Sequence, residues 1–193
     1  MSKERPFPTN PARRAMVLLS GGIDSAACAH FLGRDGYEVS CIFLDYGQAA
    51  AEAESRASKA LAERLGFTLS SHKVTPAPTF KKGEIRGRNA FLIMAAFLFS
   101  SPSISVIALG VHSGPPYYDC SPAFAKIMDR VLEEYSDGSI RLHMPFLYWT
   151  KKNVVDYYRD AGLPMELTYS CEMGHPNPCG RCPSCRDRRI LEC

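Results

Sequence analysis

The stretch Ala15-Met16-Val17-Leu18-Leu19-Ser20-Gly21-Gly22-Ile23-Asp24-Ser25 decides the fold of this chain. Its first five residues are all apolar, which is typical of a strand buried on both faces of a parallel sheet. The two glycines allow a sharp turn and a close approach of the backbone to a ligand. Residues 24–33 then place small and apolar side chains at helical spacing. The stretch therefore predicts a strand, a glycine turn and the start of a helix.

The predicted turn has the chemistry of a phosphate-binding loop. The free backbone N–H groups and the dipole at a helix start favour an anion, and the hydroxyls of Ser20 and Ser25 can add donors. Two common phosphate loops are excluded, because the chain has neither Gly-x-x-x-x-Gly-Lys-Ser/Thr nor Gly-x-Gly-x-x-Gly after an apolar run. The alternative is a glycine turn without a catalytic role.

Apolar runs and helical patterns alternate along the rest of the chain. This alternation predicts an α/β fold with a doubly wound parallel sheet, in which ligands bind beyond the carboxyl ends of the strands. Motifs that follow the first, second and fourth strands should therefore converge. We expect further strands at 37–44, 67–74 and 104–109, helices at 49–65, 89–100, 124–135 and 151–161, and a short extended segment at 140–148.

The composition is that of an ordinary globular protein. The chain has 193 residues, of which 46% are hydrophobic and 22% charged, and a net charge of +3 makes no case for nucleic acid. No apolar run is long enough to cross a bilayer, so no membrane partner is expected. Residues 1–14 are expected to be a flexible leader without the apolar core of a secretion signal, ahead of a nucleotide-binding domain at 15–165.

The C-terminal residues 166–193, here called the cysteine tail, are expected to form a zinc-binding segment packed on the main domain. Four thiolates suit tetrahedral zinc, and the intervening glycines and prolines allow tight turns. Two disulfides and an iron–sulfur cluster are the alternatives; the clustering of the cysteines favours a reducing, cytoplasmic compartment and a closed structural site. The expected metal ligands are Cys171, Cys179, Cys182 and Cys185.

Ser-Gly-Gly-x-Asp-Ser resembles the pyrophosphate loop of the ATP pyrophosphatase superfamily. In combination with later motifs, the chain resembles the 7-cyano-7-deazaguanine synthase family, also called the QueC family, over residues 15–188. The later motifs are Tyr46-Gly47-Gln48, Arg88-Asn89, Asp119-Cys120, Thr150-Lys151 and the tail from Ser170-Cys171 to Cys185-Arg186.

The resemblance implies a Rossmann-type sheet like that of the adenine nucleotide α-hydrolases. It also implies ATP-dependent adenylation of 7-carboxy-7-deazaguanine, attack by ammonia to give an amide, and a second activation that gives the nitrile, a queuosine precursor. Mg²⁺ would accompany the ATP, and Zn²⁺ would occupy the cysteine tail. A carboxylate needs such an adenylate before it becomes a good electrophile, and donors of the loop would stabilise the departing pyrophosphate.

The resemblance also assigns roles to residues. Lys151 could equally be a solvated residue at a helix start, Tyr118 a packing aromatic and Asp119 the N-cap of the helix that follows it. His112, after the fourth strand, carries only a weak functional signal. The implied catalytic residues are Asp24, Ser25, Lys151 and Arg88; the implied nucleotide-binding residues are Leu19, Ser20, Gly21, Gly22, Asp24, Ser25, Tyr46 and Gln48; the implied substrate-binding residues are Arg88, Asn89, Tyr118 and Asp119.

The chain departs from the family pattern at two main places. Three alanines at 49–51 replace a segment that usually holds a histidine, and residues 113–118 form a shortened loop that lacks the expected acid. Since this loop would handle substrate, the nucleophile stays open between ammonia and a protein amine, the latter as in QueC-like proteins of bacterial antiviral defence. Modification of tRNA and a non-catalytic zinc-ribbon interaction module are further alternatives. A homodimer is expected by analogy, and residues 75–87 are a candidate lid.

Overall fold

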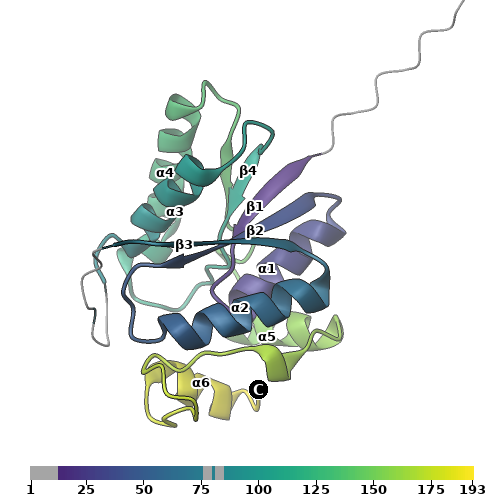
Figure 1. The fold of residues 1–193 in the computed structure, drawn as a ribbon, viewed down its shortest axis with the longest axis vertical. Coiled ribbons are helices and arrows are strands. Elements are labelled where there is room, and N and C mark those ends of the chain that lie inside the picture. The colour runs from purple at the N-terminus through teal and green to yellow at the C-terminus, as the bar shows by residue number, and fades with distance from the viewer. Residues whose placement is uncertain (1–12, 76–79, 81–84) are drawn as a thin grey trace, which may run out of the picture.

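The computed structural model describes residues 13–75, 80 and 85–193, so most of the predicted leader and lid lie outside the described residues. The described part contains five strands and six α-helices in alternation (Figure 1). The strands are β1 Arg14–Leu18, β2 Glu38–Asp45, β3 Thr68–Lys73, β4 Val106–Ala108 and β5 Arg141–His143; the helices are α1 Ile23–Arg34, α2 Ala51–Leu65, α3 Arg88–Phe99, α4 Pro122–Tyr135, α5 Lys151–Asp160 and α6 Pro183–Ile190.

The strands form one parallel sheet in the order β3-β2-β1-β4-β5, which confirms the predicted fold class. The register places Val17 of β1 between Cys41 of β2 and Ala108 of β4. The chain runs outward from β1 to β3 and then returns to place β4 on the other side of β1. In such sheets the loops after the two strands at this reversal point lead to opposite faces and leave a crevice at their carboxyl ends.

Helices cover both faces of the sheet (Figure 1). Alternate residues of β1 explain the two layers, because Ala15 and Val17 pack with α1, α2 and α5, whereas Met16 and Leu18 pack with α3 and α4. Successive side chains of a strand point to opposite faces, so a strand covered on both sides must be apolar throughout. This is why the run at 15–19 has no polar residue.

Two expectations of local structure need correction. The extended segment expected at 140–148 shrinks to the three residues of β5, after which the chain forms turns around Met144 and Phe146. The cysteine tail contains the helix α6, which the sequence did not predict. Its sequence, PSCRDRRI, has a proline at the first turn but no apolar stripe, and Cys185 is its one buried residue among those described.

Candidate nucleotide and substrate site

The loop between β1 and α1 is held closed by its own hydroxyl groups. Ser25 Oγ accepts a hydrogen bond from the Ser20 backbone N–H at 3.1 Å and donates to the Gly22 carbonyl at 3.0 Å. Gly21 has φ +80°, and a Cβ there would lie 2.7 Å from the Glu54 carbonyl oxygen. Gly21 is therefore required by the packing of the loop against α2, in addition to any approach of a ligand.

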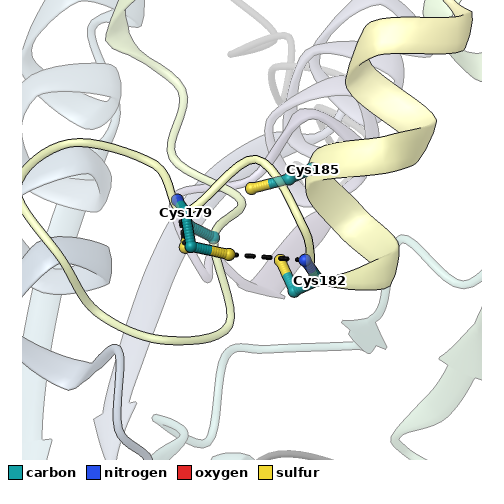
Figure 2. Close-up of side chains that lie close together, drawn as sticks. Cys179, Cys182 and Cys185 are labelled. Atoms are coloured by element: carbon teal, nitrogen blue, oxygen red, sulfur yellow. Dashed lines mark hydrogen bonds between the residues drawn. The ribbon is translucent and has the colours of Figure 1, made fainter.

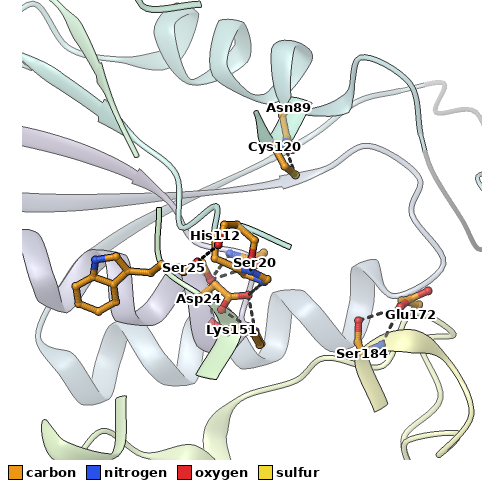
Figure 3. A network of polar contacts seen from close by, with 12 residues as sticks. Ser20, Asp24, Ser25, Asn89, His112, Cys120, Lys151, Glu172 and Ser184 are labelled. Carbon is orange, nitrogen blue, oxygen red and sulfur yellow. Dashed lines mark hydrogen bonds and ion pairs between the residues drawn. The ribbon is translucent and has the colours of Figure 1, made fainter. Parts of the chain in front are cut away.

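Asp24 lies in the first turn of α1 and pairs with Lys151, the first residue of α5 (Figure 3). Lys151 Nζ donates to both carboxylate oxygens at 2.6 Å, and His112 Nε2 lies 4.0 Å from Asp24 Oδ2. The pair is about a quarter exposed, so solvent screens it less than a surface ion pair. These contacts bring together two predicted catalytic residues and the histidine that carried a weak signal.

Local hydrogen bonds place Lys151 beside the loop. Thr150 caps α5 in a capping box with Asn153, which fixes where the helix begins. Trp149, the residue before Thr150, is bound to the chain that follows β4. The Ser113 backbone N–H and hydroxyl donate to the Trp149 carbonyl at 2.8 and 2.7 Å. Residues 113–118, the loop after β4 that departs from the family pattern, therefore orient the segment that carries Lys151.

A cleft of about 250 Å³ lies at the carboxyl ends of β1, β2 and β4. It is where parallel sheets of this order bind ligands. Of the predicted site residues, five do not line the cleft: Gly21, Gly22, Lys151, Tyr118 and Asp119. The predicted site residues in its wall are Leu19, Ser20, Asp24, Ser25, Tyr46, Gln48, Arg88 and Asn89.

Glu54 of α2 also lines the cleft, although the sequence analysis did not single it out. Gln48 Nε2 donates to Glu54 Oε2 at 2.9 Å, and Gln48 Oε1 accepts from the Tyr46 backbone N–H at 2.9 Å. Burial raises the pKa of Glu54, and the hydrogen bond from Gln48 and the charge of Arg88 oppose this shift. The cleft thus has a polar wall on which a carboxyl and a guanidinium face the same space.

Burial also raises the pKa of Tyr46, and the nearby Arg88 guanidinium opposes the shift. The ring of Tyr46 packs at an angle against two phenylalanines, with ring centroids 6.0 Å from that of Phe80 and 6.4 Å from that of Phe91. Aromatic faces of this kind suit a planar heterocycle.

The pair Arg88-Asn89 begins α3, and Asn89 is bound to the loop that carries Asp119. Asn89 Nδ2 donates to the Asp119 carbonyl at 3.0 Å, and the Asn89 backbone N–H donates to Asp119 Oδ2 at 3.3 Å. Asp119 thus accepts from a free backbone N–H at the start of α3. The helix that follows Asp119, α4, is capped by Ser121, whose hydroxyl accepts from the Phe124 N–H at 3.2 Å. Tyr118 is exposed and packs edge-to-face on Phe124.

The four tail cysteines converge, and Figure 2 shows three of them, Cys179, Cys182 and Cys185. Their sulfur atoms all lie within 4.8 Å of one another, and Cys171, Cys182 and Cys185 are buried. All four are free cysteines, with no disulfide among them in the described structure. The arrangement can hold one tetrahedral metal ion.

The surroundings of the sulfurs fit a metal of the zinc type. Backbone N–H groups of Arg181 and Cys182 donate to Cys179 Sγ at 3.4 and 3.3 Å, and these hydrogen bonds lower the pKa of Cys179 to about 6. Burial raises the pKa of Cys185 to about 12, so that sulfur needs a bound cation to ionise at neutral pH. With four sulfur ligands the site has no open position, which indicates a structural metal.

Comparisons with known proteins agree with this arrangement. The sequence matches the family described as queuosine biosynthesis protein QueC over residues 14–83 and 75–190. The chain belongs to the QueC family. A family member from Acidobacterium capsulatum, named 7-cyano-7-deazaguanine synthase, is 31% identical over 92% of this chain and 90% of its own length. Members of the same name from Aquifex aeolicus and Methanothermobacter thermautotrophicus are 31% and 30% identical and are covered to 93% and 92%.

A solved structure shares the fold of this QueC family member. The U34-tRNA thiolase NcsA from Methanococcus maripaludis, solved with its [4Fe-4S] cluster, superposes with a TM-score of 0.55 at 17% identity. The match covers 98% of this chain and 67% of the thiolase chain. Within residues 13–75, 80 and 85–193, no helix has both the length and the apolar character needed to cross a bilayer.

Proposed function

We propose that this protein adenylates 7-carboxy-7-deazaguanine with ATP and then converts the activated acid to an amide with ammonia, toward 7-cyano-7-deazaguanine. In the first step a substrate carboxylate oxygen attacks the α-phosphorus, the bond between the α and β phosphates breaks, and pyrophosphate leaves. In the second step the ammonia nitrogen attacks the acyl carbon and loses a proton, and AMP leaves. A second ATP would adenylate the amide oxygen and release a second pyrophosphate; loss of AMP with that oxygen, and of both protons from the nitrogen, would give the nitrile.

The observation that carries this proposal is the meeting of the 20–25 loop with the Asp24–Lys151 pair at the rim of a cleft, in a chain of the QueC family. Pyrophosphate gains negative charge as it leaves, and loop N–H groups, Ser20 Oγ and the Lys151 ammonium are suitable donors. The polar wall of Glu54 and Arg88 and the ring of Tyr46 suit a planar heterocycle that carries hydrogen-bonding edges.

Mg²⁺ fits the donor set at this rim, because Asp24 offers a carboxylate and hard oxygen ligands are what Mg²⁺ prefers. When bound with ATP, Mg²⁺ would neutralise phosphate charge. Lys151 would then be released from its bidentate contact with Asp24 and become free to contact a phosphate oxygen. Zn²⁺ in the cysteine tail would have the structural role described above.

One observation favours a second candidate for the acceptor. Where the family pattern has an acid, this chain has Ser113, and both its N–H and its hydroxyl are used in binding the Trp149 carbonyl. A side chain so engaged is poorly placed to handle ammonia, so a protein amine is the alternative acceptor of the same adenylate.

Product analysis tests the proposal. The protein is incubated with ATP, Mg²⁺, 7-carboxy-7-deazaguanine and ammonium, with Asp24→Ala as the inactive control, and small molecules and intact proteins are weighed by mass spectrometry. An amide or nitrile supports ammonia as the nucleophile. A mass increase on an added protein, with no free amide, supports the alternative acceptor. No change in the acid under any condition contradicts adenylation.

A further inference from the structure

The cysteine tail contacts, at two separate points, chain segments that contribute residues to the cleft. The Tyr169 backbone N–H donates to the Gly21 carbonyl at 2.9 Å, which joins the tail to the phosphate loop. Gly174 lies against the backbone of Ala49, directly after the Tyr46-Gly47-Gln48 turn. Figure 1 shows the tail beside α2, whose first residues follow that turn. The tail therefore contacts the segments that form two walls of the cleft.

The contact at Gly174 leaves no room for a side chain. A Cβ there would lie 2.1 Å from the Ala49 carbonyl oxygen and 3.1 Å from the Ala50 Cα. Gly174 also has φ +70°, which favours glycine independently of the contact. Any larger residue must move the backbone of residues 49 and 50 away by more than about 1 Å to reach an ordinary van der Waals separation.

Both points of contact lie within three residues of Cys171, the first cysteine of the cluster. Tyr169 precedes Cys171 by two residues, and its hydroxyl donates to the His175 carbonyl at 2.8 Å, across the loop that leads to Cys179. Gly174 follows Cys171 by three residues, and its N–H donates to the Cys171 carbonyl at 3.4 Å. A metal ion that gathers the four sulfurs would therefore fix the positions of both contacts.

A further link joins α6 to this segment. Arg188 Nη1 donates to the Thr168 carbonyl at 3.1 Å, one residue before Tyr169, and α6 also carries Cys185. The segment 168–174 is thus held from the α6 side by Arg188 and across its own loop by Tyr169. Gly21 in turn lies between this segment and α2, because its missing Cβ would also meet Glu54 and Ala57.

We propose that the metal-bound tail sets the spacing between the phosphate loop and the 46–48 turn, with Tyr169 and Gly174 as positioning residues for the nucleotide. Metal occupancy then controls the affinity for ATP through these two contacts, beyond holding the tail folded. This inference rests on the proposed function, because it requires that the cleft binds ATP.

The test compares two glycine substitutions with the same backbone strain. Gly174→Ala introduces the clash with Ala49, whereas Gly162→Ala is the matched control: Gly162 has φ +64°, and a Cβ there would meet nothing within 4 Å in the described structure. Metal content is measured by elemental analysis, thermal unfolding by circular dichroism, and binding of a non-hydrolysable ATP analogue by calorimetry. A misplacement of about 1 Å can cost a site about 10²-fold in rate, and we take a loss of about tenfold in binding as the criterion here.

The expected result is that Gly174→Ala keeps its metal and its fold but binds the ATP analogue at least about tenfold more weakly, with a raised KM for ATP. Gly162→Ala should bind it like the wild type. In wild-type protein treated with a chelator, affinity for the analogue should fall to a similar extent and return when Zn²⁺ is restored.

Two outcomes separate failure of this inference from failure of the proposed function. If the wild type binds the ATP analogue and Gly174→Ala binds it equally well with its metal retained, the positioning role is contradicted. If the wild type does not bind the analogue at all, the proposed function fails first. Should Gly174→Ala lose its fold, the chelator experiment on the wild type decides: an affinity for the analogue that does not change when the metal is removed contradicts the inference.

Discussion

Lys151 places its Nζ 2.6 Å from both carboxylate oxygens of Asp24, although 127 positions separate the two residues in the chain. The contact joins the starts of α1 and α5 at the rim of the cleft. In the proposed reaction the lysine exchanges this carboxylate for a phosphate oxygen.

Replacing Lys151 by alanine is expected to lower kcat/KM for adenylation by about 10²-fold or more, because the departing pyrophosphate loses a positive donor. Lys151→Arg should retain part of the activity. The free energy of unfolding should fall by more than the about 1 kcal/mol typical of an exposed ion pair, because the pair is only about a quarter exposed and Asp24 would lose its partner. Steady-state kinetics with ATP and the deazaguanine acid provide the measurement.

The neighbouring residue supplies the control. Lys152 lies on the same helix and pairs with exposed Asp156 at 2.6 Å. Lys152→Ala should leave kcat/KM near the wild-type value. Equal losses in the two variants would contradict a specific role for Lys151.

Cys179→Ser is expected to remove the metal and to destabilise the tail, because three sulfurs hold zinc much less tightly than four. Elemental analysis should find about one zinc per chain in the wild type. Cys193→Ser, which lies outside the cysteine cluster, should keep the metal. A brown, iron-containing wild-type protein would contradict zinc in favour of an iron–sulfur cluster.

Glu54→Gln tests the buried carboxyl through the pH dependence of stability. Burial raises the pKa of Glu54 above the value of about 4.3 in the unfolded chain. Its stabilising contribution is therefore fully present below that unfolded value and is lost as the pH rises through the folded-state pKa. Relative to the wild type, Glu54→Gln should gain stability between pH 4 and pH 7, as measured by urea unfolding at each pH.

Glu63→Gln changes an exposed residue of the same helix and should show no such gain. A stability difference between Glu54→Gln and wild type that is the same at both pH values would mean that Glu54 titrates alike in the folded and unfolded chains. That result would contradict a buried carboxyl in the wall of the cleft.

Asp119 allows its capping role to be separated from a role in substrate binding. Asp119→Asn keeps an oxygen that can accept from the Asn89 N–H, whereas Asp119→Ala removes it and should reduce stability by about 1 kcal/mol. We expect Asp119→Asn to unfold like the wild type but to raise KM for the deazaguanine acid and not for ATP. An unchanged KM for the acid would leave Asp119 with the capping role alone.

The sheet and its order of elements could be predicted because apolar runs and helix-forming segments alternate clearly, and because β1 is apolar on both faces. The helix α6 could not, since its residues carry no apolar periodicity and its one buried side chain in the described tail is Cys185. Its position depends on the cysteine cluster and on Arg188, which are long-range effects.

Part of the site could also be predicted from the sequence. The 20–25 loop and the cysteines are local motifs, but the pairing of Asp24 with Lys151 requires the sheet to bring α1 and α5 together. Glu54 was missed, although a signal existed: it shares helical spacing with the buried residues Ala57, Ser58 and Leu61. An acid on an otherwise buried helical stripe indicates a polar cavity or a binding site.

The nucleotide product tests most directly the claim that the 20–25 loop binds ATP for adenylation of a deazaguanine acid. The protein is incubated with ATP and Mg²⁺, with and without 7-carboxy-7-deazaguanine, and nucleotides are separated by chromatography. The predicted result is AMP and pyrophosphate that form only with the acid and are abolished by Asp24→Ala. Formation of ADP and phosphate, or AMP release that does not depend on the acid, would contradict the claim.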